Sequence, residues 1–175
     1  KDPIGVIEVF KRVRKQFPCR LVLCGSMATD DPEGWDIFEQ TREAAGPLLD
    51  DKEVILITVE DNVLVNTLQR KSAVVIQKSI REGFGLTVTE ALWKGTPVVA
   101  SNVGGIPRQV IDNTTGFLVE PFDYNACAEL VLSLLRHPKV GAVLGANGKE
   151  HVRRNFLITR HIIDDLRLLN KLLAK

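Results

Sequence analysis

The 175-residue chain has few of the residues that mark several classes of protein. Its three cysteines, Cys19, Cys24 and Cys127, are an odd number without Cys-x-x-Cys spacing, which argues against a disulfide framework or a zinc site. It has no apolar run of about 18 residues for crossing a bilayer. Lys and Arg total 23 against 22 for Asp and Glu, so the basic excess of nucleic-acid binders is absent. We therefore expect a reduced, cytoplasmic, soluble protein with no nucleic-acid or membrane partner.

Hydrophobic residues make up 45% of the sequence, and their spacing alternates between two periods along the chain. Short, almost wholly apolar runs predict buried strands over 20–25, 54–58, 73–77, 97–100 and 117–120. Apolar residues at three- and four-residue spacing predict helices over 2–17, 62–72, 86–94 and 106–111. A further helix is predicted to begin at 31, and the chain after 123 is predicted to be helical. Strands that alternate with helices imply right-handed parallel βαβ units. We expect an α/β fold, a Rossmann-like open sheet of about six parallel strands with helices on both faces.

Several residues are expected to start or orient the helices. Asp2, Asp31 and Asp123 are predicted N-caps, the first two followed by proline at the first helical position. The helix after Asp31 is expected to turn Trp35, Phe38 and Ala45 inward. Near the C-terminus, one more apolar stripe is formed by Ile162, Leu166, Leu169 and Leu173.

We predict that residues 1–175 form one domain. A doubly wound domain normally begins with a strand, whereas Lys1 stands directly before a helix. The chain is therefore expected to be part of a longer polypeptide and to lack the first strand of the fold. A natural short domain that begins with a helix is the alternative.

The segment Ser79–Leu92 joins a predicted strand to a helix, at the sheet edge where α/β proteins bind ligands. Gly83 and Gly85 permit close backbone approach, and the first amides of the helix suit a phosphate. The carboxylates of Glu82 and Glu90 suit the hydroxyls of a ribose or hexose. On spacing alone, the glycines are better explained as turn residues and Glu90 as a solvated side chain. The third glycine of the dinucleotide fingerprint and the P-loop pattern are both absent.

The order of motifs resembles a known family. Glu82 to Glu90 looks like the E-x7-E motif of retaining glycosyltransferases with the two-domain GT-B fold, and Lys94–Ala100, Gly104–Pro107 and Thr115–Val119 look like its continuation. The resemblance covers essentially the whole chain and implies the C-terminal, donor-binding half of that fold. It implies a hexosyltransferase whose acceptor-binding, N-terminal domain lies outside these residues.

The resemblance also implies roles for the two glutamates. Glu82 would be the catalytic residue, contacting the donor glucose close to its anomeric carbon, either as nucleophile or as electrostatic support. Glu90 would bind the ribose hydroxyls of the nucleotide.

For the diphosphate, the resemblance implies the amides of Gly85, Leu86 and Thr87 together with the Lys1 ammonium, whose Arg partner would precede residue 1. These charges would replace a metal, and the sequence has no Asp-x-Asp motif. No metal or other cofactor is therefore expected, since the nucleotide-sugar is a substrate.

A narrower resemblance, carried by residues 30–35, 79–85, 91–95 and 155–161, is to trehalose synthases that transfer glucose from a nucleotide donor to free glucose. It implies UDP-glucose or ADP-glucose as donor and glucose as acceptor, and leaves a homodimer open. The alternatives are a non-catalytic nucleotide-sugar binding module and a transferase of the same family with another acceptor. The Glu82–Glu90 spacing argues against the sugar-phosphate epimerases that share the fold.

Overall fold

Five strands form at the five segments expected from the sequence. The computed structural model describes residues 1–25 and 32–174. The strands are β1 (Leu21–Cys24), β2 (Val54–Ile57), β3 (Val75–Gln77), β4 (Val98–Ser101) and β5 (Phe117–Val119). The helices are α1 (Pro3–Arg14), α2 (Pro32–Ala45), the 3-10 turn η1 (Gly46–Leu48), α3 (Asn62–Lys71), α4 (Leu86–Trp93), α5 (Ile106–Gln109), α6 (Tyr124–Arg136), α7 (Pro138–Asn155) and α8 (Ile158–Leu173).

Every strand pairing is parallel, which confirms the predicted α/β class. In one sheet, β1 lies beside β2 with Leu21 opposite Val54. In the other, β4 lies between β3 and β5, and Val99 stands opposite both Ile76 and Phe117. The expectation of one open sheet of six strands differs from this arrangement of five strands in two hydrogen-bonded groups. The division arises because no described strand pairs with the second edges of β1 and β3.

Two aspartates cap helix N-termini at the positions that the sequence predicted. The Asp2 carboxylate accepts a hydrogen bond of 2.8 Å from the Gly5 amide, and Pro3 follows it. The Asp123 carboxylate accepts one of 2.8 Å from the Ala126 amide. Both bonds satisfy an amide that the first helical turn leaves unpaired. Asp31 lies outside the described residues.

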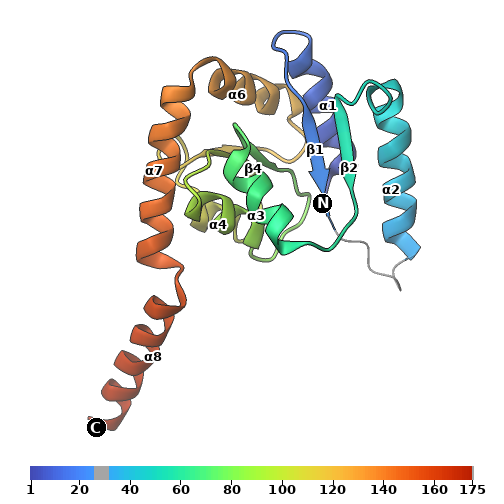
Figure 1. The fold of residues 1–175 in the computed structure, drawn as a ribbon. Coiled ribbons are helices and arrows are strands. Elements are labelled where there is room, and N and C mark those ends of the chain that lie inside the picture. The colour runs from blue at the N-terminus through green and yellow to red at the C-terminus, as the bar shows by residue number, and fades with distance from the viewer. Residues whose placement is uncertain (26–31, 175) are drawn as a thin grey trace.

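Helices cover both faces of β4, whose four residues are all buried. On one face, Val99 packs in a cluster with side chains of α1 and α6. On the other face, Val98 and Ala100 pack with side chains of α4 and with Val152 of α7. Figure 1 shows α6 and α7 bordering the body, while α2 lies beside β2 at the opposite side. The prediction of helices on both faces is therefore confirmed.

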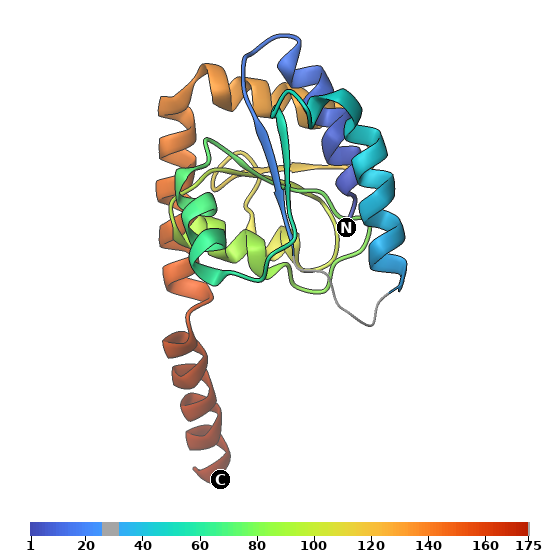
Figure 2. The ribbon, with the colours of Figure 1, turned by 45° about the vertical axis from the view of Figure 1, so that its right-hand side comes forward.

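Two expectations about helix faces differ from the structure. Trp35 is 50% exposed and contacts the ring of Phe38 edge-on at 6.1 Å, so only Ala45 of the expected inner face is fully buried. Helix α8 has no buried residue and extends away from the body in both views (Figures 1 and 2). Its apolar stripe is therefore exposed, because periodicity reports amphipathic character and not the surface that covers it. No helix in the described ranges is long and apolar enough to span a membrane.

Candidate functional site

The loop from Lys78 to Gly85 leaves the carboxyl end of β3 and leads into α4, as the sequence predicted. Gly85 precedes the helix with φ of +87°, in the left-handed region that glycine adopts without strain. A side chain there would also meet Glu82 Cγ at 3.4 Å and Ile106 Cγ1 at 3.3 Å. The amides of Leu86 and Thr87 have no hydrogen-bond acceptor among the described residues. The start of α4 therefore offers two unpaired donors beside the loop.

A second glycine turn supports the loop from behind. The Gly105 amide donates a hydrogen bond of 2.9 Å to the Gly83 carbonyl. Gly104 has φ of +55°, and a Cβ on it would clash with the Glu82 carbonyl oxygen. The two backbones thus lie in direct contact, and the Gly104–Gly105 turn holds the backbone of the loop that carries Glu82 in position.

Glu82 lies at the centre of a polar cluster. Its carboxylate forms an ion pair with the Lys1 ammonium, and it accepts hydrogen bonds from Ser79 Oγ at 3.1 Å and Gln77 Nε2 at 3.3 Å. Burial alone raises the pKa of the Glu82 carboxyl, but the Lys1 bond and charge, with the Ser79 and Gln77 bonds, outweigh it and lower the pKa overall. Glu82 is therefore ionised at neutral pH and held beside a cation.

Glu90 lies on α4 and has different partners. Gln69 of α3 donates a hydrogen bond of 2.8 Å from Nε2 to Glu90 Oε2. The Lys94 ammonium in turn donates to Gln69 Oε1. The structure thus directs Glu82 toward the start of α1 and the end of β3, and Glu90 toward α3. Both belong to the segment that follows β3, as expected.

Three buried glutamines contact this segment, and no sequence pattern predicts their burial. Gln69 and Gln77 are each 6% exposed, and Gln109 is 0% exposed. Gln109 Nε2 donates to the Phe84 carbonyl, while its Oε1 accepts from Thr89 Oγ1. One glutamine therefore holds Glu82, another the loop, and a third Glu90.

Lys78 is a further residue that sequence reasoning missed. It is 3% exposed, and its ammonium donates to the carbonyls of Glu120, at 3.2 Å, and Pro121. Burial lowers the pKa of Lys78, opposed by the charges of nearby acidic groups. These bonds tie the carboxyl end of β3 to that of β5. A lysine in a loop reads as a solvated residue, so only the tertiary structure reveals its burial.

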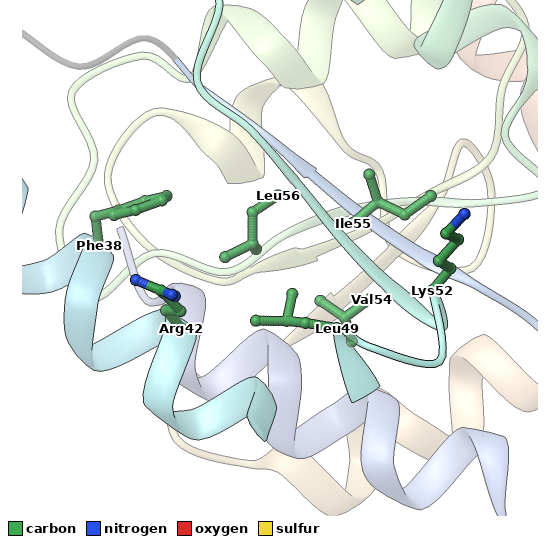
Figure 3. A pocket seen from close by; sticks show the side chains of 7 residues that line it. All are labelled: Phe38, Arg42, Leu49, Lys52, Val54, Ile55 and Leu56. Carbon is green, nitrogen blue, oxygen red and sulfur yellow. The ribbon is translucent and has the colours of Figure 1, made fainter. Parts of the chain in front are cut away.

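An open pocket between α2 and β2 lies apart from these residues. Figure 3 shows its lining side chains, which are Phe38, Arg42, Leu49, Lys52, Val54, Ile55 and Leu56. None of the expected site residues contributes to it, and it is mainly apolar. Within residues 1–25 and 32–174, no group of three or more His, Cys, Asp or Glu side chains is arranged to hold a metal ion.

Comparison with known proteins identifies the family. Residues 1–151 match the family described as "Glycosyl transferases group 1". The chain belongs to this family. The glycosyltransferase domain is 49% identical over 173 residues to a trehalose synthase of Pyrococcus horikoshii, covering 98% of this chain and 41% of that protein. It is 50% identical over 180 residues to a trehalose synthase of Rubrobacter xylanophilus, covering 99% and 41%.

A solved structure supports the same assignment. The C-terminal domain of a group 1 glycosyl transferase, LpcC from Francisella tularensis, superimposes with a TM-score of 0.79 at 26% identity, covering 90% of this chain and 80% of that one. The glycosyltransferase domain therefore has the fold of the C-terminal half of a GT-B enzyme, as predicted. It spans about two fifths of the length of the curated relatives.

Proposed function

We propose that this domain binds the donor in a retaining glycosyltransferase that transfers glucose from a nucleoside-diphosphate glucose to glucose and forms trehalose. The observation that carries the proposal is identity of about one half to trehalose synthases along nearly the whole chain. The proposal includes an acceptor-binding domain outside these residues, since the relatives are more than twice as long.

In this proposal the cluster around Glu82 faces the reacting end of the donor. The bond between the anomeric carbon and the diphosphate oxygen breaks, and its electron pair leaves with the diphosphate. The acceptor hydroxyl oxygen forms the new bond to the same carbon, and the hydroxyl proton passes to the departing diphosphate. The Lys1 ammonium and the unpaired amides of Leu86 and Thr87 stabilise the departing diphosphate, while the Glu82 carboxylate stabilises positive charge at the anomeric carbon. The contact between Lys1 and Glu82 supports this assignment, because the diphosphate and the anomeric carbon are adjacent in one donor.

Glu90 binds the ribose hydroxyls in this proposal. A carboxylate near the start of a helix is poorly suited to an anion, yet it accepts hydrogen bonds well from neutral hydroxyls. No step requires a metal, and the charges of Lys1 and of the α4 amides take its place.

The test uses the longer polypeptide, with trehalose formation measured from UDP-glucose or ADP-glucose and glucose. We expect turnover, and a loss of roughly 100-fold or more in kcat on Glu82→Gln. Glu129→Gln, an exposed residue of α6, is the matched control and should leave kcat unchanged. The 175-residue chain alone should bind UDP but form no trehalose, because it supplies one wall of a two-domain site.

Other outcomes would identify the alternatives. Donor binding by the longer polypeptide without turnover on any sugar would mean a non-catalytic module. Turnover onto another acceptor, with none onto glucose, would retain the transferase and refute the trehalose assignment.

A further inference from the structure

We propose that Gln69 is a positioning residue that holds the Glu90 carboxylate in the orientation that receives the nucleotide ribose. The inference rests on the proposed function, in which Glu90 binds that ribose. Gln69 comes from α3, 21 residues before Glu90 and outside the loop–helix segment that carries the motif, and no feature of the motif points to it.

The geometry around Gln69 leaves its carboxamide little freedom. The side chain is 6% exposed, and its Nε2 donates to Glu90 Oε2 at 2.8 Å. Its backbone is also fixed, because Thr96 Oγ1 donates a hydrogen bond of 2.6 Å to the Gln69 carbonyl. Rotation of the side chain would break its hydrogen bonds to Glu90 and Lys94, and the buried carboxamide has little contact with water that could replace them.

Lys94 determines which end of the carboxamide faces Glu90. An ammonium group only donates hydrogen bonds, so the atom that Lys94 contacts must be the oxygen of Gln69. The amide nitrogen is then the atom that faces Glu90. The donor toward Glu90 is thus set by the chemistry of three linked side chains, and not by an arbitrary assignment of amide nitrogen and oxygen.

The bond from Gln69 occupies one oxygen of Glu90 and leaves the other available. In the described part of the chain, Glu90 Oε1 has no hydrogen-bond partner, and the residue is exposed. A ligand hydroxyl can therefore approach Oε1 while Oε2 stays tied to α3. Without Gln69, the ligand would have to immobilise a freely rotating glutamate, which corresponds to roughly a 2- to 10-fold loss of affinity.

The experiment measures binding of UDP and of inorganic pyrophosphate to the 175-residue chain by titration calorimetry. Gln69→Met keeps the length of the side chain and removes its donor, so UDP should bind about 2- to 10-fold more weakly and pyrophosphate equally well. Gln40→Met, on the exposed part of α2, is the matched control and should change neither ligand.

A second variant gives a readout that a role in packing would not produce. Gln69→Glu places a carboxylate against Glu90, so UDP should bind more weakly than to Gln69→Met at pH 7.5. Lowering the pH toward 5.5 should restore binding, because one proton shared by the two carboxylates replaces the lost donor. The charged groups near this pair are Lys94 and Arg70, both basic residues, so neither adds a further carboxylate to it. Pyrophosphate and the unchanged chain, titrated over the same range, correct for ionisation of the ligands.

Glu90→Ala separates this inference from the function on which it rests. If Glu90→Ala weakens UDP selectively while both Gln69 variants bind UDP like the unchanged chain at every pH, Gln69 does not position Glu90. If Glu90→Ala weakens UDP and pyrophosphate equally, or the unchanged chain binds no UDP, the proposed role of Glu90 fails and the inference fails with it.

Discussion

Replacing Gln109 by methionine tests how the loop of the site is held. Gln109 is fully buried on α5, where it donates to the Phe84 carbonyl and accepts from the Thr89 hydroxyl. Methionine has nearly the same length, so packing is retained while both hydrogen bonds are lost. The change therefore isolates the polar contribution of one side chain.

The expected loss of stability depends on whether the two former hydrogen-bond partners of Gln109 can find other partners. Thr89 is half-buried on α4, and its hydroxyl can turn to water or to the carbonyl one turn before it, so its loss costs little. The Phe84 carbonyl faces the Gln109 side chain, which has no exposed surface, and methionine in that place supplies no donor. A buried carbonyl left without a donor costs about 1–3 kcal/mol, and we expect the free energy of unfolding to fall by that amount.

Urea unfolding followed by far-ultraviolet circular dichroism measures this difference. The slope against urea should stay constant while the midpoint falls, since the surface exposed on unfolding hardly changes. Gln40→Met, on the exposed part of α2, is the control and should stay within about 0.5 kcal/mol of the unchanged chain. An unaltered midpoint for Gln109→Met would refute the reasoning, because the loop would then be held without this bond.

Two further predictions concern other parts of the domain. Gly104→Ala combines a positive φ with a Cβ placed against the Glu82 carbonyl, so it should lower the free energy of unfolding by about 2–4 kcal/mol, measured in the same urea assay. Gly25→Ala should cost less, because no atom of residues 1–25 or 32–174 lies within 4 Å of the new Cβ. Burial raises the pKa of the Cys127 thiol from 9.0 to about 11, so Ellman's reagent at pH 8 should modify Cys127 only on unfolding, and rapid modification in the folded state would contradict this burial. The free energy of unfolding should fall as the pH rises from 9 toward 11, because the folded chain then holds a proton that the unfolded chain has released.

Much of the fold was predictable from local chemistry. The strands around Val22, Ile55 and Val99 are short apolar runs, and Asp2 and Asp123 cap helices with bonds that depend on neighbouring residues only. The loop between β3 and α4 was predictable as well, because glycines interrupt the apolar pattern at a strand end. The catalytic role of Glu82 and the binding roles of Lys1, Gly85, Leu86, Thr87 and Glu90 stay predictions. The experiments above test the roles of Glu82 and Glu90.

The parts that were not predictable depend on contacts between distant segments. Gln69, Gln77 and Gln109 are buried because each faces a polar group brought by another element, and no local pattern distinguishes them from surface glutamines. Lys78 is buried because the β5 end supplies two carbonyls. Trp35 is half exposed although it is large and apolar, because no element in the described part of the chain covers it fully.

The hydrogen bond between Gly105 and Gly83 has a consequence for protein engineering. The two glycine turns are separated in sequence by a helix and a strand, yet their backbones pack directly against each other. Grafting the Glu82 loop from a homologue with a different donor preference would therefore fail if the Gly104–Gly105 turn were left behind. A chimera should exchange residues 79–90 and 102–109 as one cassette, so that Gln109 travels with the loop it holds.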